Sequence, residues 1–156
     1  MGDRQQSSKH FMQPTAIDRL FNRLFGFIVG LGFGPKQNYL LEVQGRKTGR
    51  TYTTPVNVLE ENANKYIVAP RGYTHWVRNV LSSGEAHLVK GRTRERIRLQ
   101  AIADNQKSAI LKAYLDRYKR TVQRYFPVRA GSPVEAFEPI AEQYPVFRVT
   151  AVGGPL

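Results

Sequence analysis

Six consecutive residues, Gly45 to Arg50, combine side chains that suit an anionic ligand. Arg46, Lys47 and Arg50 supply positive charge, and Thr48 supplies a hydroxyl donor. Glycines permit a tight turn through positive φ, and such a turn leaves backbone N–H groups that point outward and attract an anion. The motif therefore predicts a loop that binds a phosphate or a carboxylate. A solvated hairpin turn with ordinary basic residues is the alternative.

The composition of the chain also favours an anionic partner. The formal net charge is +12, from 24 lysines and arginines against 12 acidic residues. Such an excess attracts nucleic acid, an anionic membrane surface or a polyanionic small molecule. No zinc or RNA-binding motif is present, so we expect no nucleic-acid partner. The chain has no cysteine and no metal-binding histidine spacing, so we also expect no metal site.

Two predicted strands, residues 38–44 and 51–59, must position the basic loop. Apolar residues alternate along the first of them, as in a half-buried strand. Pro55 interrupts the second, because proline cannot donate a ladder hydrogen bond. It predicts an edge, a bulge or a place where a ligand approaches the backbone.

Four further strands are predicted at residues 65–69, 85–90, 93–103 and 145–151. Six short strands joined mainly by hairpins indicate an antiparallel barrel. The interior of such a barrel is filled by side chains, so a ligand must lie outside it or at a junction with a helix or a subunit. In the strand 93–103 we expect three residues to point inward and an arginine row to form a solvated outer face, with a binding role for the row as the alternative. The inward residues are Ile97, Leu99 and Ala101, and the row is Arg94, Arg96 and Arg98.

Besides one or two helical turns at residues 75–81, three helices are predicted around the strands. The first runs from Thr15 to Val29, after a polar and disordered tail at residues 1–14, and opens a single domain of residues 15–156. Its apolar stripe packs on the sheet or, alternatively, lies in a membrane interface. The second covers residues 104–125 and the third covers residues 135–143.

Three blocks carry a resemblance to a known family. Gly45 to Arg50, followed by Thr54-Pro55-Val56, resembles the GRKSG…TPL signature of deazaflavin-dependent nitroreductases. Residues 69–80 are similar to the family's second block, a glycine turn followed by W-x-x-N-L, and residues 144–148 resemble its closing strand. The resemblance implies a split antiparallel β-barrel of about six strands with flanking helices, of the flavin-reductase and PNPOx type. It also implies hydride transfer from coenzyme F420 to quinones, nitro compounds or activated alkenes, with FMN as a less favoured cofactor.

The resemblance also implies which residues contact the cofactor. The basic loop would hold the phosphate and the glutamate tail, through Arg46, Lys47, Thr48, Gly49 and Arg50. Two segments would surround the ring, namely Thr54, Pro55 and Val56 on one side and Ala69, Arg71 and Gly72 on the other. Trp76 would wall the pocket or anchor its helix in the core. The candidate proton donors are Tyr114 and Tyr118, which are otherwise amphipathic core residues.

The alternative function is a split-barrel protein that binds a deazaflavin, a fatty acid or another lipid without turnover. The expected setting is the cytoplasm, with a peripheral contact to the inner face of the plasma membrane if the helix from Thr15 to Val29 touches lipid. We expect a monomer or a homodimer that acts on a small electrophilic substrate.

Overall fold

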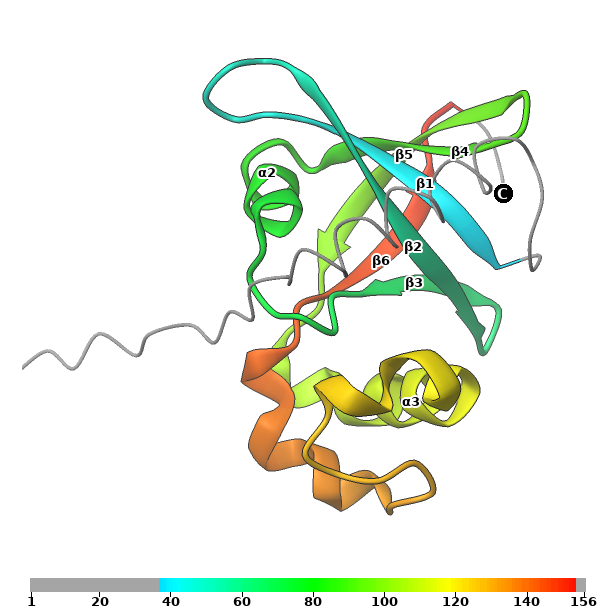
Figure 1. The fold of residues 1–156 in the computed structure, drawn as a ribbon, viewed down its shortest axis with the longest axis vertical. Helices are drawn as coiled ribbons and strands as arrows, with labels where there is room; N and C mark the ends of the chain where they lie inside the picture. The colour runs from blue at the N-terminus through cyan, green and yellow to red at the C-terminus, as the bar shows by residue number, and fades with distance from the viewer. Residues whose placement is uncertain (1–36, 154–156) are drawn as a thin grey trace, which may run out of the picture.

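Six antiparallel strands form a closed barrel in the computed structural model, which describes residues 37–153 (Figure 1). Their order around the barrel is β1-β2-β3-β6-β5-β4. The strands are β1 (Asn38–Gln44), β2 (Thr51–Glu61), β3 (Asn64–Val68), β4 (Glu85–Lys90), β5 (Thr93–Ala101) and β6 (Val146–Ala151). The predicted antiparallel barrel of about six strands is therefore confirmed.

The barrel interior is filled by alternate residues of the strands, as the pleat requires. Leu41, Ile67, Ile97 and Phe147 are among the most deeply buried side chains of this core. The helix α2 (His75–Ser83) adds Val77 and Val80 to the same cluster. Because side chains occupy the interior, a ligand site must lie outside the barrel wall.

A second apolar cluster joins the outer side of β2, β3 and β6 to the helical segments. The long helix α3 (Ser108–Val122) and the 3-10 helix η3 (Val134–Gln143) pack against each other there, and Figure 1 shows α3 beside β3, with η3 next to α3 at the same end of the barrel. Short 3-10 turns flank α3, η1 (Asp104–Gln106) before it and η2 (Gln123–Tyr125) after it. This cluster fixes the end of α3 relative to β2.

The structure corrects three details of the helical and strand predictions. The helix predicted over residues 104–125 is divided into η1, α3 and η2, with non-helical dihedrals at Tyr118 (φ −112°, ψ 21°). The segment predicted as a helix over residues 135–143 is a 3-10 helix that contains Pro139. The strand predicted over residues 93–103 ends at Ala101, whose side chain is exposed rather than inward.

Other predictions lie outside the described residues, namely the helix from Thr15 to Val29, the disordered tail and the domain boundary at residue 15. In the part of the chain that the structure does describe, no helix has the length and apolarity needed to cross a membrane.

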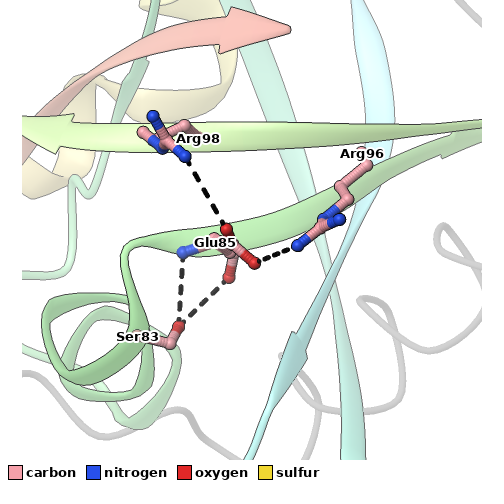
Figure 2. Close-up of polar contacts among 4 residues, drawn as sticks. All are labelled: Ser83, Glu85, Arg96 and Arg98. Carbon is pink, nitrogen blue, oxygen red and sulfur yellow. Dashed lines mark hydrogen bonds and ion pairs between the residues drawn. The ribbon is translucent and has the colours of Figure 1, made fainter. Parts of the chain in front are cut away.

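The arginine row of β5 faces solvent, as predicted. Each of the three side chains is more than half exposed. Arg94 pairs with Glu42 at 2.9 Å, while Arg96 and Arg98 lie 2.8 and 3.9 Å from the carboxylate of Glu85 (Figure 2). The hydrogen bond from Arg96 lowers the pKa of Glu85. Exposed ion pairs of this kind contribute little to stability. The arginine row is therefore a solvated face of the barrel.

Candidate functional site

A cavity of about 900 Å³ lies outside the barrel, where β2 meets the helical segments. Its wall comes from the β1–β2 loop, the strand β2, the end of β3, the start of α2 and the end of α3. Val56 and Val58 of β2 point into the barrel, so Thr53, Pro55 and Asn57 lie on the outer face. This position agrees with the prediction that a ligand site lies outside the barrel or at a junction with a helix or a subunit.

The β1–β2 loop is a closed turn. The Gly45 N–H donates to the Arg50 carbonyl at 2.7 Å, and the Gly49 N–H donates to the Gly45 carbonyl at 2.9 Å. Gly49 has φ +70°, which favours glycine, and a Cβ on Gly45 would lie 2.7 Å from Tyr52 Cε2. The Arg50 N–H is also used, because Thr48 Oγ1 accepts it at 3.3 Å.

Asn79 of α2 anchors this loop to the rest of the protein. Its Oδ1 accepts the Arg46 N–H at 3.2 Å and Arg46 Nη1 at 2.8 Å. Figure 1 shows the loop projecting beyond the barrel above α2, the helix that carries this side chain. Asn79 is 4% exposed, so it holds the loop from a buried position. Four of the six backbone N–H groups of the loop therefore donate hydrogen bonds within the protein. The prediction that these groups point outward and bind an anion is wrong, and the loop can attract an anion mainly through its charged side chains.

Pro55 lies in the part of β2 that has a neighbouring strand on one side only. Residues 51–57 pair with β1, whereas β3 pairs with β2 only from Val58 onward. The Val58 N–H donates to the Gln37 carbonyl on the β1 side at 2.9 Å. Because backbone direction alternates along a strand, the nitrogen of Pro55 faces away from β1. Proline therefore removes no ladder hydrogen bond here, and the prediction of an edge position is confirmed.

The segment between β3 and α2 forms the middle of the wall. The Gly72 N–H donates to the Ala69 carbonyl at 3.1 Å, and φ of +83° at Gly72 makes this a tight turn. Trp76 lines the cavity and also packs on the barrel core, with its ring centroid 6.0 Å from that of Phe147. Trp76 therefore lines the cavity and also anchors α2 in the core. The Thr74 hydroxyl is buried and has no hydrogen-bond partner among the described residues.

Two tyrosines of α3 form the opposite wall. Tyr118 Oη donates to the Val58 carbonyl at 3.1 Å, and its ring centroid lies 5.2 Å from that of Tyr114. Burial raises the pKa of both phenols. A hydrogen bond with Asn57 acts on Tyr114 in the opposite sense, although it is smaller than the effect of burial. These side chains therefore stay protonated at neutral pH.

Tyr125 and Arg124 extend this wall beyond α3. Arg124 Nη2 donates to Tyr125 Oη at 2.6 Å, and its guanidinium carbon lies 4.8 Å from the centre of the ring. The Tyr144 hydroxyl donates to the Tyr125 carbonyl at 2.6 Å, which ties η2 to the segment before β6. The predicted helix over residues 104–125 ends at these two residues, and its apolar spacing gave no reason to select them.

Most of the predicted site residues come together in this one cavity. Those that line it are Arg46, Lys47, Thr48, Thr54, Pro55, Val56, Ala69, Arg71, Trp76, Tyr114 and Tyr118. Three do not appear in its wall, namely Gly49, Arg50 and Gly72. The structure adds polar residues that the sequence did not single out, namely Asn38, Asn57, Thr74, His75, Arg124 and Tyr125.

The lysine, arginine and carboxylate side chains of the cavity wall are unequally represented, with an excess of positive charge. Four lysines and arginines line it, and the described lining residues include no aspartate or glutamate. The four are Arg46, Lys47, Arg71 and Arg124. Within residues 37–153 there is also no group of histidine, aspartate and glutamate side chains that could hold a metal ion. The cavity therefore suits a polyanion that carries an apolar, flat portion.

Solved structures with a similar fold include proteins of several kinds. The protein Atu2129 of Agrobacterium tumefaciens, of unknown function, is 15% identical with a TM-score of 0.53 over 92% of this chain and 59% of that one. HutZ, the heme storage protein of Vibrio cholerae, is 10% identical with a TM-score of 0.51 over 76% and 84%. An F420-H2 dependent reductase, FDR-A, is 18% identical with a TM-score of 0.49 over 74% and 95%. At these identities the matches to Atu2129 and HutZ show the barrel fold alone.

Sequence comparison identifies the family. No match is found among curated protein sequences. A family model described as F420H(2)-dependent quinone reductase matches residues 17–132, well over half of the 156 residues. The matched range contains the basic loop, Pro55, α2 and most of the tyrosine wall. The chain therefore belongs to the F420H(2)-dependent quinone reductase family.

Proposed function

We propose that this protein transfers hydride from reduced coenzyme F420 to a quinone, a nitro compound or an activated alkene. The observation that carries the proposal is the cavity itself, in which a basic loop, a proline-bearing strand and a wall of tyrosines meet. Membership of the family supplies the cofactor class.

The residues present fit this cofactor. Ligand pockets have volumes of roughly 300–1,000 Å³, so the cavity of about 900 Å³ has room for a large cofactor and an acceptor together. Coenzyme F420 carries a phosphodiester and a glutamate tail, and the cavity offers cations without carboxylates. The Thr74 hydroxyl, which has no partner among the described residues, is a further donor for a bound ligand.

In this proposal, Arg46 and Lys47 bind the phosphate and the tail. Asn79 holds the Arg46 side chain in place through the 2.8 Å hydrogen bond, so less conformational entropy is lost on binding. Each charge-assisted contact contributes about 1.5–3 kcal/mol in general, and exposed contacts fall at the lower end. Pro55, with no N–H to bury, and Trp76 bound the space for the ring.

When bound, the reduced deazaflavin supplies the hydride. The protein orients the acceptor, excludes water and provides a proton. Tyr114 and Tyr118 lie against each other and present a largely apolar surface to a planar acceptor. The tilted arrangement of their rings (58°) leaves an edge and a face for stacking. No charged catalytic residue is required, because the cofactor carries the redox chemistry.

The test is to mix the protein with reduced F420 and, in turn, a quinone, a nitroaromatic and an enone. We expect oxidation of the cofactor that depends on both protein and acceptor, together with micromolar or tighter binding of oxidised F420 by fluorescence titration. Failure to bind F420 would contradict the proposal. Binding without turnover on any of the three acceptors would favour the alternative, a deazaflavin- or lipid-binding protein.

A further inference from the structure

Tyr118 donates its hydroxyl hydrogen to the Val58 carbonyl, whereas the Tyr125 hydroxyl acts as an acceptor. Its hydroxyl oxygen accepts the 2.6 Å bond from Arg124 Nη2. A hydroxyl that accepts a hydrogen bond keeps its own hydrogen for another partner. Both residues line the cavity, so a ligand there can receive that hydrogen.

The two tyrosines of α3 are poorer proton donors. Tyr118 gives its hydroxyl hydrogen to the Val58 carbonyl, and this bond must break before the hydrogen can go elsewhere. Tyr114 is only 2% exposed, and burial raises its pKa because the phenolate would lose its hydration. Burial also raises the pKa of Tyr118, and a hydrogen bond with Arg117 has a smaller and opposite effect. Tyr125 has the Arg124 guanidinium 4.8 Å from its ring centre.

The backbone that carries Tyr125 is held from both sides. The Tyr144 hydroxyl binds the Tyr125 carbonyl at 2.6 Å. Gln123, in the same 3-10 turn, donates to the Val128 carbonyl and accepts the Ala130 N–H, both at 2.8 Å. A side chain on a turn fixed in this way keeps a defined position in the cavity wall.

We infer that Tyr125 is the acid that protonates the acceptor during reduction, and that Arg124 positions its hydroxyl and stabilises the phenolate that results. This inference rests on the proposed function, with a reduced deazaflavin as the source of hydride. A quinone that has gained a hydride, which is two electrons and one proton, carries one negative oxygen. The Tyr125 O–H bond breaks and a new O–H bond forms on that oxygen, which completes the hydroquinone. Water then returns a proton to the phenolate beside Arg124.

The test compares Tyr125→Phe with Tyr66→Phe, a buried tyrosine of β3 that does not line the cavity. General acid catalysis contributes about 10²–10⁴-fold, so kcat for menadione should fall about 100-fold in Tyr125→Phe, while KM changes no more than about tenfold. The Kd of oxidised F420 should stay unchanged. Tyr66→Phe should keep kcat within about twofold.

A second measurement does not depend on turnover. With oxidised F420 bound, menadione cannot be reduced, and its affinity can be measured by calorimetry. Loss of one neutral hydrogen bond should weaken it about two- to tenfold in Tyr125→Phe. If that variant is unfolded, Arg124→Met retains the tyrosine and should lower kcat about tenfold at saturating F420.

The outcomes separate the inference from the proposed function. If the unchanged protein binds F420 and reduces menadione, but Tyr125→Phe or Arg124→Met retains full kcat, Tyr125 is not the acid and the inference is overturned. If the unchanged protein does not bind F420, the proposed function fails first, and the inference is overturned with it.

Discussion

Reversing the charge of the basic loop should remove most of the affinity for the cofactor. In Arg46→Glu/Lys47→Glu, two cations that line the cavity become anions. Both side chains are exposed, so each lost contact is taken at about 1–1.5 kcal/mol, between the range for exposed ion pairs and that for hydrogen bonds to charged groups. The two together amount to about 2–3 kcal/mol, which is roughly a 30- to 150-fold rise in Kd.

A matched control separates this local effect from the change in net charge. Arg92→Glu/Lys119→Glu also replaces one arginine and one lysine, both exposed and neither in the cavity wall. Exposed charges that do not contact the ligand are weakened by solvent and salt. We therefore expect the Kd of the control to rise less than about threefold.

The assay is fluorescence titration of oxidised F420 at two ionic strengths. The Kd of the unchanged protein should rise with salt, and the loop variant should lose most of that dependence. Equal Kd values for the loop variant and the control would contradict a direct contact of Arg46 and Lys47 with F420, because the loop would then contribute nothing beyond net charge.

Three further predictions concern the supports of the site. Asn79→Ala removes both bonds to Arg46 from a buried position, so unfolding by urea should show a loss of about 1–3 kcal/mol and F420 should bind more weakly; unchanged stability and affinity would show that the anchor is dispensable. Gly49→Ala places a side chain at φ +70°, which should cost about 1–2 kcal/mol in the same experiment, and a neutral result would mean that the turn can rearrange. Burial raises the pKa of Tyr144 to about 12 in the folded protein, against an ordinary value of 10.0. As pH rises, the Tyr144 phenol loses its proton in the unfolded state before it does so in the folded state. Its contribution to the free energy of unfolding is therefore constant below pH 10 and falls between pH 10 and 12. Tyr144→Phe should reduce the slope of Tm over that range, and an identical slope would count against the assignment.

The sequence was sufficient for the barrel because alternation and turn residues are local signals. Pro55 shows this well, since its missing N–H predicts an edge and the pairing of β2 with β1 alone provides one. The residue types of Gly45 to Arg50 were sufficient to identify the basic loop, but they did not predict its hydrogen bonds. The Oδ1 of Asn79, 33 residues away, accepts the Arg46 N–H that was expected to face a ligand.

The tyrosine wall could be predicted only in part. Tyr114 and Tyr118 share a helix face by spacing, and both line the cavity. Arg124 and Tyr125 depend on the non-helical dihedrals at Tyr118 and on the turn η2, which redirect the chain after α3. Such a change of direction is set by tertiary packing, including the bond from Tyr144, rather than by local propensity.

A crystal structure of the protein with oxidised F420 tests the central claim most directly. We expect the deazaflavin ring to lie against Pro55 and Trp76 outside the barrel, and the phosphate to lie within hydrogen-bonding distance of Arg46 or Lys47. A cofactor bound elsewhere, or bound in this cavity with its phosphate away from the basic loop, would contradict the proposed binding mode.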